Sequence, residues 1–323
     1  MKVILKKMVM LVFGPPVKYI ISQMALHRET NQKLHALEQR IHDIYPDEWR
    51  LNEATLLEIE RVKKVLALPS RLDMGISKND MMLLHFINNG FSVEAAVRAY
   101  LVRGVSLLDM VSKIAEKRWG SGWAREAGPF LDFASGYGTL ERHLVHVMRP
   151  EHIYTADVKK HGVDFQIERF GVNGIVSSFI PEEFRPGMKF PFIFVASLFS
   201  HLPEDLFRRW LIQLLNCLAP LGVLAFTVHD TSLCNSDDDF IYSTQSEDSD
   251  SVVEDSIKNA SVYGTTFVSE NYLSRCFSDL GLAKENYTRY RKISSGLQDI
   301  YIVSKAPVTF DNIRFNAYDS EAI

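Results

Sequence analysis

Apolar residues recur at helical spacing from residue 27 to about residue 120, with charged residues between them. One such stripe, at 3-4-3 spacing, consists of Leu34, Leu37, Ile41 and Ile44. This pattern is typical of a helix that buries one face. Two heptads are few for a coiled coil, so we expect the helix to pack on its own domain, with pairing of two copies as the alternative.

Two further helices are predicted in this part of the chain. The stretch NEATLLEIERVKKVLAL has Asn52 as its N-cap, and SVEAAVRAYLVRG has Ser92 as N-cap and Gly104 as its end. No alternating apolar pattern of a strand interrupts them. The first 120 residues are therefore predicted to be all-helical.

The pattern changes at about residue 128, where short apolar runs begin to alternate with helical stripes. The predicted strands cover 130–133, 152–157, 174–178, 191–197, 222–229, 284–292 and 299–305. The predicted helices cover 139–148, 161–170, 203–218 and 269–280. Such alternation predicts a mostly parallel, seven-stranded α/β sheet with helices on both faces.

The last two predicted strands are joined by the short connection KISSGLQ. A crossover helix does not fit there, so these strands are expected to form a C-terminal antiparallel hairpin. The predicted organisation is a helical region over 1–127, an α/β domain over 128–306 and a tail over 307–323. Within the domain, residues 231–262 are strongly acidic; we expect a solvated loop there, with a mobile lid as the alternative.

The N-terminal segment, residues 1–26, is a basic and apolar arm. It has four lysines, no acidic residue before Glu29, and an apolar run, Met8–Phe13, that Gly14 cuts short. It has no signal-peptide cleavage pattern. Two interpretations stay open: an arm packed on protein, or peripheral contact of residues 1–24 with an anionic membrane surface.

Composition narrows the classes of function. The hydrophobic content of 46% is ordinary for a globular protein, and the net charge of -4 does not favour nucleic-acid binding. Three cysteines show neither metal-site spacing nor a disulfide framework, so a reducing, cytoplasmic location is expected, and no metal site.

The stretch FLDFASGYGTLERHL places an acid, two glycines and a helix start close together. Asp132 ends the first strand, and Gly136 and Gly138 form the turn. Glycines at such a turn let a ligand lie against the backbone, as dinucleotides and S-adenosylmethionine do. A dinucleotide motif has a third glycine where this chain has Glu141. The cationic S-adenosylmethionine tolerates acids here, whereas a diphosphate does not.

Asp157 ends the second predicted strand, 21 residues after Gly136. A carboxylate at that place can accept hydrogen bonds from both ribose hydroxyls. Asp132, Gly136, Gly138 and Asp157 together favour S-adenosylmethionine as the cofactor.

The chain also resembles class I S-adenosylmethionine-dependent methyltransferases, over roughly residues 128 to 306. The motifs that carry the resemblance are LDFASGYGTLERHL, IYTADV, FIFVASLFSHLPEDLFRRWLIQLLNCLAPLGVLAFTVHD and QDIYIVSK. Upstream, AYLVRG followed by helices resembles bacterial members that act on glycans and secondary metabolites. The resemblance implies a Rossmann-like fold and a small-molecule or glycan substrate.

The resemblance also implies roles for single residues. Ser135 would join the methionine-side loop, Ser177 or Ser178 would lie by the adenine, and Ala196 and Ser197 would lie beside the cofactor. Ala134 stands where the family's first glycine usually stands, which is tolerable if its φ is negative. The family's adenine-binding aspartate is absent.

Candidate catalytic groups follow the fourth and fifth strands, at the edge where open α/β sheets bind their ligands. His201 follows strand four, and His229 and Asp230 end strand five. A hydroxyl acceptor must lose its proton, and a histidine of near-neutral pKa suits that task. The helix pair His143 and His146 lacks a third metal ligand, so surface histidines are expected there.

We therefore predict methyl transfer from S-adenosylmethionine to a small-molecule or sugar hydroxyl. The alternatives are an NAD-dependent oxidoreductase and a catalytically silent cofactor-binding or scaffold protein assembled through the N-terminal helices.

Overall fold

The structure is a computed structural model that describes residues 48–49, 51–234, 236–244, 263–307 and 309–318. The chain divides into two compact units, Met1–Arg50 and Leu51–Ile323. The basic arm, the stripe from Leu34 to Ile44 and residues 245–262 lie outside the described residues. Membrane contact, pairing through N-terminal helices and the domain boundary at residue 127 stay predictions. No helix within the described residues is both long enough and apolar enough to cross a membrane.

Among the described residues four α-helices precede the sheet, the last being the short α5 (Trp123–Glu126), and a polar side chain caps each of the first three. α2 (Glu53–Val65) begins after Asn52, whose Oδ1 accepts a hydrogen bond from the Thr55 N–H at 2.8 Å. α3 (Met81–Asn88) is capped by Asp80, and α4 (Val93–Trp119) by Ser92. Such caps satisfy amide groups that the first turn leaves without partners. The two predicted N-caps are confirmed.

Gly104 does not end α4, contrary to the prediction. The helix continues to Trp119 and ends at Gly120, which has a φ of 76°. A Cβ at position 104 would lie 2.4 Å from the ring of His143 and 2.7 Å from the Thr139 carbonyl oxygen. Glycine is therefore required here because α4 packs directly against the segment that follows the first strand.

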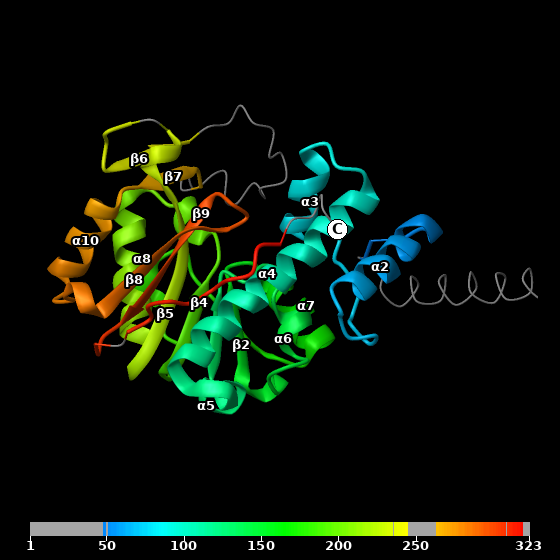
Figure 1. Ribbon diagram of the computed structural model, residues 1–323, viewed down its shortest axis with the longest axis horizontal. Coiled ribbons are helices and arrows are strands. Elements are labelled where there is room, and N and C mark those ends of the chain that lie inside the picture. Colours follow the sequence, from blue (N-terminus) through cyan, green and yellow to red (C-terminus); the bar gives the residue numbers. More distant parts are fainter. Residues whose placement is uncertain (1–47, 50, 235, 245–262, 308, 319–323) are drawn as a thin grey trace, which may run out of the picture. The chain divides into compact units, whose positions relative to one another are not determined.

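The predicted parallel strands form one sheet in the order β3-β2-β1-β4-β5 (Figure 1). Their bounds are Phe130–Phe133 for β1, Ile153–Asp157 for β2, Asn173–Val176 for β3, Phe190–Val195 for β4 and Leu218–Asp230 for β5. All four pairings between these strands are parallel. Their carboxyl ends therefore meet at the same edge of the sheet.

The C-terminal hairpin is confirmed. β9 (Gln298–Ser304) pairs antiparallel with β5 on one side and with β8 (Tyr287–Ser294) on the other. The expected Rossmann-like, mostly parallel sheet with a C-terminal antiparallel hairpin is present, and all seven predicted strands belong to it.

Two more strands bring the sheet to nine among the described residues. β6 (Phe240–Ser243) and β7 (Thr265–Val268) pair with each other, and β7 pairs parallel with the end of β5 at His229 and Asp230. Because β9 occupies one edge of β5 at His229, β7 lies on the other edge, beyond the end of β4. The expectation of a loop was therefore wrong for β6, whose short apolar run is hidden among acidic residues.

Alternate residues of the central strands feed two apolar cores, one on each face of the sheet. Leu131 and Phe133 point to the face covered by α8 (Glu204–Cys217) and α10 (Glu270–Asp279). Phe130 points to the opposite face, toward α4. Asp132 therefore projects from the same face as Phe130, where α4 and α6 (Glu141–Leu144) lie.

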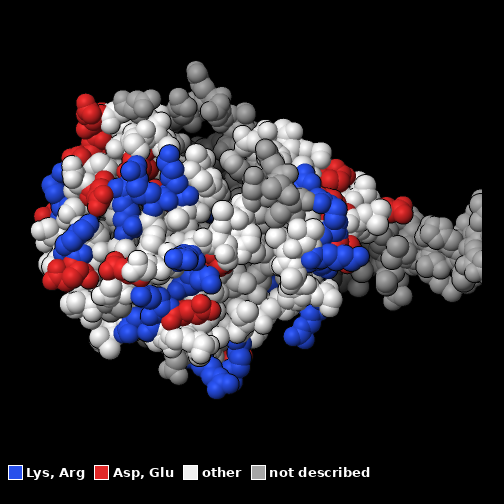
Figure 2. All heavy atoms as spheres, viewed as in Figure 1, with Lys and Arg blue, Asp and Glu red and all other residues white. Residues whose placement is uncertain are grey.

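The remaining helices agree in part with the sequence pattern. α7 (Lys160–Phe170) and α8 cover the predicted ranges, and the stripe of α8 that includes Phe207, Trp210 and Leu214 lies in the core as expected. The helix predicted over 139–148 is reduced to α6, followed by turns. Basic and acidic side chains are interspersed over the face shown in Figure 2.

Candidate functional site

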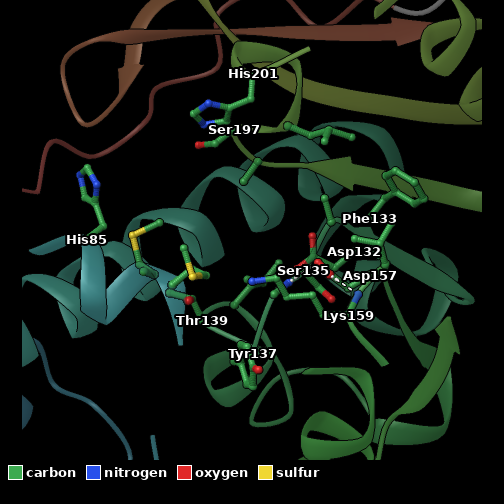
Figure 3. Close-up of a pocket in the computed structure, with 18 of the residues that line it drawn as sticks. His85, Asp132, Phe133, Ser135, Tyr137, Thr139, Asp157, Lys159, Ser197 and His201 are labelled. Carbon is green, nitrogen blue, oxygen red and sulfur yellow. Dashed lines mark hydrogen bonds between the residues drawn. The ribbon is translucent and has the colours of Figure 1, made fainter. Parts of the chain in front are cut away.

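A cavity of about 660 Å³ opens at the carboxyl ends of the parallel strands. Strand ends contribute Asp132, Asp157, Ala196, Ser197 and His229 to its wall. This is the edge at which open α/β sheets bind ligands. Figure 3 shows Asp132, Ser135 and Asp157 on one side of the cavity, with Ser197 and His201 across from them.

The glycine turn after β1 is left-handed at three positions. Gly136 and Gly138 have φ values of 61° and 82°, which glycine adopts at no steric cost. A Cβ at Gly138 would lie 2.5 Å from the Phe170 ring, whereas one at Gly136 would meet no atom within 4 Å. Gly138 therefore serves packing beneath the turn and does not line the cavity, while Gly136 does.

Ala134 also has a positive φ, 59°. It therefore lacks the negative φ that would make alanine tolerable in place of the family's glycine. Ser197, at the end of β4, has a φ of 64°. Both residues line the cavity. Non-glycine residues in this region carry strain of order 1–3 kcal/mol, and such strain gathers at functional sites.

Asp157 is held in place by two backbone amides. Its Oδ2 accepts a hydrogen bond from the Gly136 N–H, and its Oδ1 accepts one from the Lys159 N–H, both at 2.9 Å. Burial raises the pKa of Asp157, and these two hydrogen bonds act in the opposite direction. The carboxyl group thus bridges the glycine turn and the start of α7, with lone pairs left for a ligand.

Asp132 and Glu141 form a pair of buried carboxyl groups. Asp132 is 5% exposed and Glu141 is 0% exposed. Burial, and then the neighbouring Glu141, raise the pKa of Asp132 well above its usual range. Burial raises the pKa of Glu141 to about 7. Burial and the neighbouring carboxyl group therefore favour the protonated form of this pair.

Ser177 and Ser178 lie in the wall beyond β3, together with Phe179. The Ser178 hydroxyl donates to Glu183 Oε2 at 2.6 Å, whereas the buried Ser177 Oγ has no hydrogen-bond partner among the described residues. Phe179 is 45% exposed. An aromatic face beside a hydroxyl suits a flat heterocycle.

His201 lies on the side of the cavity opposite the carboxylates (Figure 3). Its Nδ1 lies 2.8 Å from the Gly264 carbonyl oxygen, so Nδ1 carries the hydrogen and the lone pair of the neutral ring is on Nε2. The ring stacks on Tyr263, with 4.4 Å between centroids. These contacts orient His201 as a candidate proton acceptor.

His229 is less suited to that role. Its Nε2 lies 3.2 Å from Gln298 Nε2, and Gln298 Oε1 already accepts hydrogen bonds from Ser197 and Thr227. The amide nitrogen must therefore donate to His229 Nε2, which occupies the lone pair that a base needs. Burial lowers the pKa of His229, so the ring is neutral at pH 7.

Asp230 does not face the cavity. Its carboxylate pairs with Arg289, which also binds Asp299 at 2.5 Å and Glu270 at 2.8 Å. The structure thus joins Asp230 to the C-terminal hairpin instead of to His229. The cause is the alternation of a strand, which sends neighbouring side chains to opposite faces.

Several residues at the site were not found from the sequence. α3 contributes Met81, Met82 and His85 to the cavity wall, and α4 contributes Arg103. Helical periodicity marks such positions only as part of a helix, because the facing partners lie far away in the chain. His143 was expected on the surface but is 2% exposed, packed against α4 at Gly104. Among the described residues, no cluster of three metal-binding side chains occurs.

Comparison with known proteins finds similarity among solved structures only. No protein-family model matches the chain, and no curated protein matches it. DesVI from Streptomyces venezuelae is 14% identical, over 72% of this chain and 99% of its own, with a TM-score of 0.47. An O-methyltransferase family protein from Burkholderia thailandensis is 14% identical, over 71% and 64%, with a TM-score of 0.42. An S-adenosylmethionine-dependent methyltransferase from Clostridium acetobutylicum ATCC 824 is 12% identical, over 54% and 82%, with a TM-score of 0.38.

A likeness at 14% identity and a TM-score of 0.47 does not establish what this chain does. The order of the strands describes the fold. After β3-β2-β1-β4-β5, an antiparallel strand, β9, lies between β5 and β8. The fold is Rossmann-like, with a mostly parallel sheet and a C-terminal antiparallel hairpin. In this fold, the glycine turn after β1 and the acid at the end of β2 lie at the ligand-binding edge, as they do here.

Proposed function

We propose that this protein is a methyltransferase that uses S-adenosylmethionine and acts on a small molecule or sugar, with a hydroxyl as the favoured acceptor. The observation that carries the proposal is the pairing of a glycine turn with two carboxyl groups, Asp132 and Asp157, at one end of the cavity. The buried Glu141 lies beside Asp132, behind the cavity wall. A cationic nucleoside is favoured by such an environment, and a diphosphate is disfavoured.

Asp157 would hold the ribose hydroxyls, because its two oxygens are already oriented by backbone amides. Asp132 would face the cationic methionine part of the cofactor. Ser177, Ser178 and Phe179 would line the adenine side. When bound, S-adenosylmethionine supplies an electrophilic methyl group attached to a positively charged sulfur.

The residues across the cavity would bind and prepare the acceptor. His201 would take the hydroxyl proton at Nε2, since Nδ1 is held by the Gly264 carbonyl. The strained Ser197 and the apolar wall residues would exclude water and align the acceptor oxygen. The size of the cavity leaves room for an acceptor beside the cofactor.

An NAD-dependent oxidoreductase is the second candidate, because it too uses a glycine turn at this edge. The two candidates differ in the charge they require near the turn. Glu141 is buried where a dinucleotide site has a glycine, and Asp132 lies beside it. The buried acidic pair favours the methyltransferase.

Calorimetry on the full chain tests the proposal. S-adenosylhomocysteine is expected to bind with micromolar affinity and NAD is not. Labelled S-adenosylmethionine, incubated with the protein and a cell extract, should then transfer its methyl group to a small molecule or glycan. Micromolar binding of NAD without binding of S-adenosylhomocysteine would refute the proposal. Cofactor binding without any labelled product would instead favour the scaffold alternative.

A further inference from the structure

Arg103 is a buried cation in the cavity wall that pairs with no carboxylate of the described residues. It lies on α4, is 7% exposed and reaches the cavity. Its Nη1 donates to Ser294 Oγ at 2.5 Å and to Ser295 Oγ at 3.2 Å, and its Nη2 donates to Ser197 Oγ at 3.4 Å. All three acceptors are neutral hydroxyls.

Two other arginines, the partly buried Arg289 and the fully buried Arg142, lie near carboxyl groups that balance their charge. Arg289 is surrounded by the carboxylates of Asp230, Glu270 and Asp299. Arg142 is 0% exposed, and its charge acts on the carboxyl groups of Asp80 and Glu141. Arg103 has no carboxylate partner among the described residues, and burial alone lowers its pKa, to about 10. It therefore remains a buried cation at neutral pH.

An unbalanced buried charge destabilises the folded protein. This destabilisation is reduced when a ligand supplies the opposite charge. The guanidinium is also already oriented by three hydroxyl groups from the ends of β4 and β8. A planar fork of donors held in this way suits the oxygens of a carboxylate or phosphate.

The position of Arg103 indicates which ligand carries the anion. Its partner Ser197 lies across the cavity from Asp132 and Asp157 (Figure 3). The cavity thus has an acidic end at the glycine turn and a basic end between α4, β4 and the β8–β9 hairpin. A cationic nucleoside belongs at the acidic end, which leaves the basic end to the second substrate.

We propose that Arg103, with Ser197, Ser294 and Ser295, forms a subsite for an anionic oxygen group on the methyl acceptor. The acceptor is therefore a hydroxy acid or a phosphorylated sugar or alcohol, and an uncharged glycan is disfavoured. This inference rests on the proposed function, since it names the chemical class of that function's acceptor. The carboxylate of the cofactor's methionine part is the other anion that would suit Arg103, and the experiment must separate the two.

The test compares the full-length protein with Arg103→Gln and Arg103→Lys. Arg118→Gln is the matched control, because Arg118 is on the same helix, outside the cavity wall, and donates to the Leu221 carbonyl. Calorimetry gives the affinity for S-adenosylhomocysteine. Inorganic phosphate and acetate are then titrated onto the protein loaded with S-adenosylhomocysteine, with chloride at equal ionic strength as the reference.

We expect Arg103→Gln to weaken phosphate or acetate binding at least tenfold and to change the affinity for S-adenosylhomocysteine less than twofold. Arg103→Lys keeps the charge and should retain part of the anion affinity. If Arg103→Gln reduces the affinity for S-adenosylhomocysteine tenfold, with or without an effect on the anions, Arg103 serves the cofactor and the proposal is wrong. Equal anion binding by the wild type and Arg103→Gln also overturns it.

A measurement on the wild type alone guards against a variant that does not fold. Labelled S-adenosylmethionine is offered with hydroxy acids and sugar phosphates, each beside its uncharged amide or dephosphorylated counterpart. Methyl transfer is expected to charged members at least tenfold faster than to their counterparts. Faster transfer to the uncharged members contradicts the anion subsite while leaving the proposed methyltransferase intact. Failure of S-adenosylhomocysteine to bind would instead contradict the proposed function itself.

Discussion

The two ends of the cavity are built in different ways. The acidic end comes from one continuous stretch, from Asp132 at the end of β1 to Asp157 at the end of β2. The basic end brings together α4, the end of β4 and the β8–β9 hairpin, and Arg103 and Ser294 are 191 positions apart in the chain. A site built from neighbouring elements leaves a motif in the sequence, whereas one built from distant elements does not.

The two ends also differ in which groups orient their side chains. At the acidic end, backbone amides of the glycine turn and α7 orient a carboxylate. At the basic end, side chains orient each other through Ser197, Gln298 and Arg103. We infer that the acidic end holds the cofactor and the basic end selects and activates the acceptor. The predictions below test whether the two ends can be changed independently.

The largest effect is expected from His201→Ala at the acceptor end. With the acceptor identified by the labelled panel, turnover should fall by roughly 10²- to 10⁴-fold, the usual contribution of general acid–base catalysis. The affinity for S-adenosylhomocysteine should be unchanged. His229→Gln is the matched comparison and should lower turnover far less, because Gln298 already occupies His229 Nε2. Normal turnover by His201→Ala would show that the acceptor needs no histidine base.

Asp157→Ala is expected to weaken binding of S-adenosylhomocysteine by about 10- to 100-fold, or about 1–3 kcal/mol. The reason is the loss of hydrogen bonds from the ribose hydroxyls to a charged group. Calorimetry measures the effect. The control is Asp164→Ala on the exposed face of α7, where Asp164 pairs with Lys160. An affinity equal to that of the wild type would remove Asp157 from the cofactor site.

The smallest effect is a pH dependence at the Asp132 and Glu141 pair. Below pH 7 the pair holds a proton, because the pKa of Glu141 is raised to about 7. A cationic ligand favours the deprotonated pair, so binding releases a proton. The affinity for S-adenosylmethionine, whose sulfur is positively charged, should therefore rise with pH between about 6 and 8, by at most about tenfold per pH unit. Calorimetry across this range measures it, and Glu141→Gln should flatten the profile.

In the ligand-free protein, the same pair makes the free energy of unfolding fall as the pH rises. A carboxyl group with a raised pKa binds more protons in the folded state than in the unfolded state. Between the ordinary pKa of 4.5 and about 7, its contribution to the free energy of unfolding therefore falls as pH rises. His143, whose pKa is lowered to about 3 by burial, acts oppositely up to about pH 6.5. The difference between wild type and Glu141→Gln cancels the His143 contribution, and the absence of any pH trend in that difference would contradict the raised pKa of Glu141.

The sequence pattern predicted some helices and strands correctly and missed others. Seven strands, α7, α8 and α10 were found because their buried faces repeat with a regular period. β6 and β7 were missed because strands of four residues are too short to show a clear period, and β6 in addition lies in the acidic segment. α4 was cut short at Gly104, since a glycine needed for contact with His143 looks the same in sequence as one that ends a helix.

The sequence by itself determined the alternation of strands and helices, the C-terminal hairpin, and the glycine turn with Asp132 and Asp157. These features depend on local periodicity and on residues that are close in the chain. Only the tertiary structure decided that Glu141 is buried beside Asp132, that Arg289 binds Asp230, and that Arg103 enters the cavity without a carboxylate partner among the described residues. Burial and neighbouring charged groups set these properties, and both depend on which distant elements pack together.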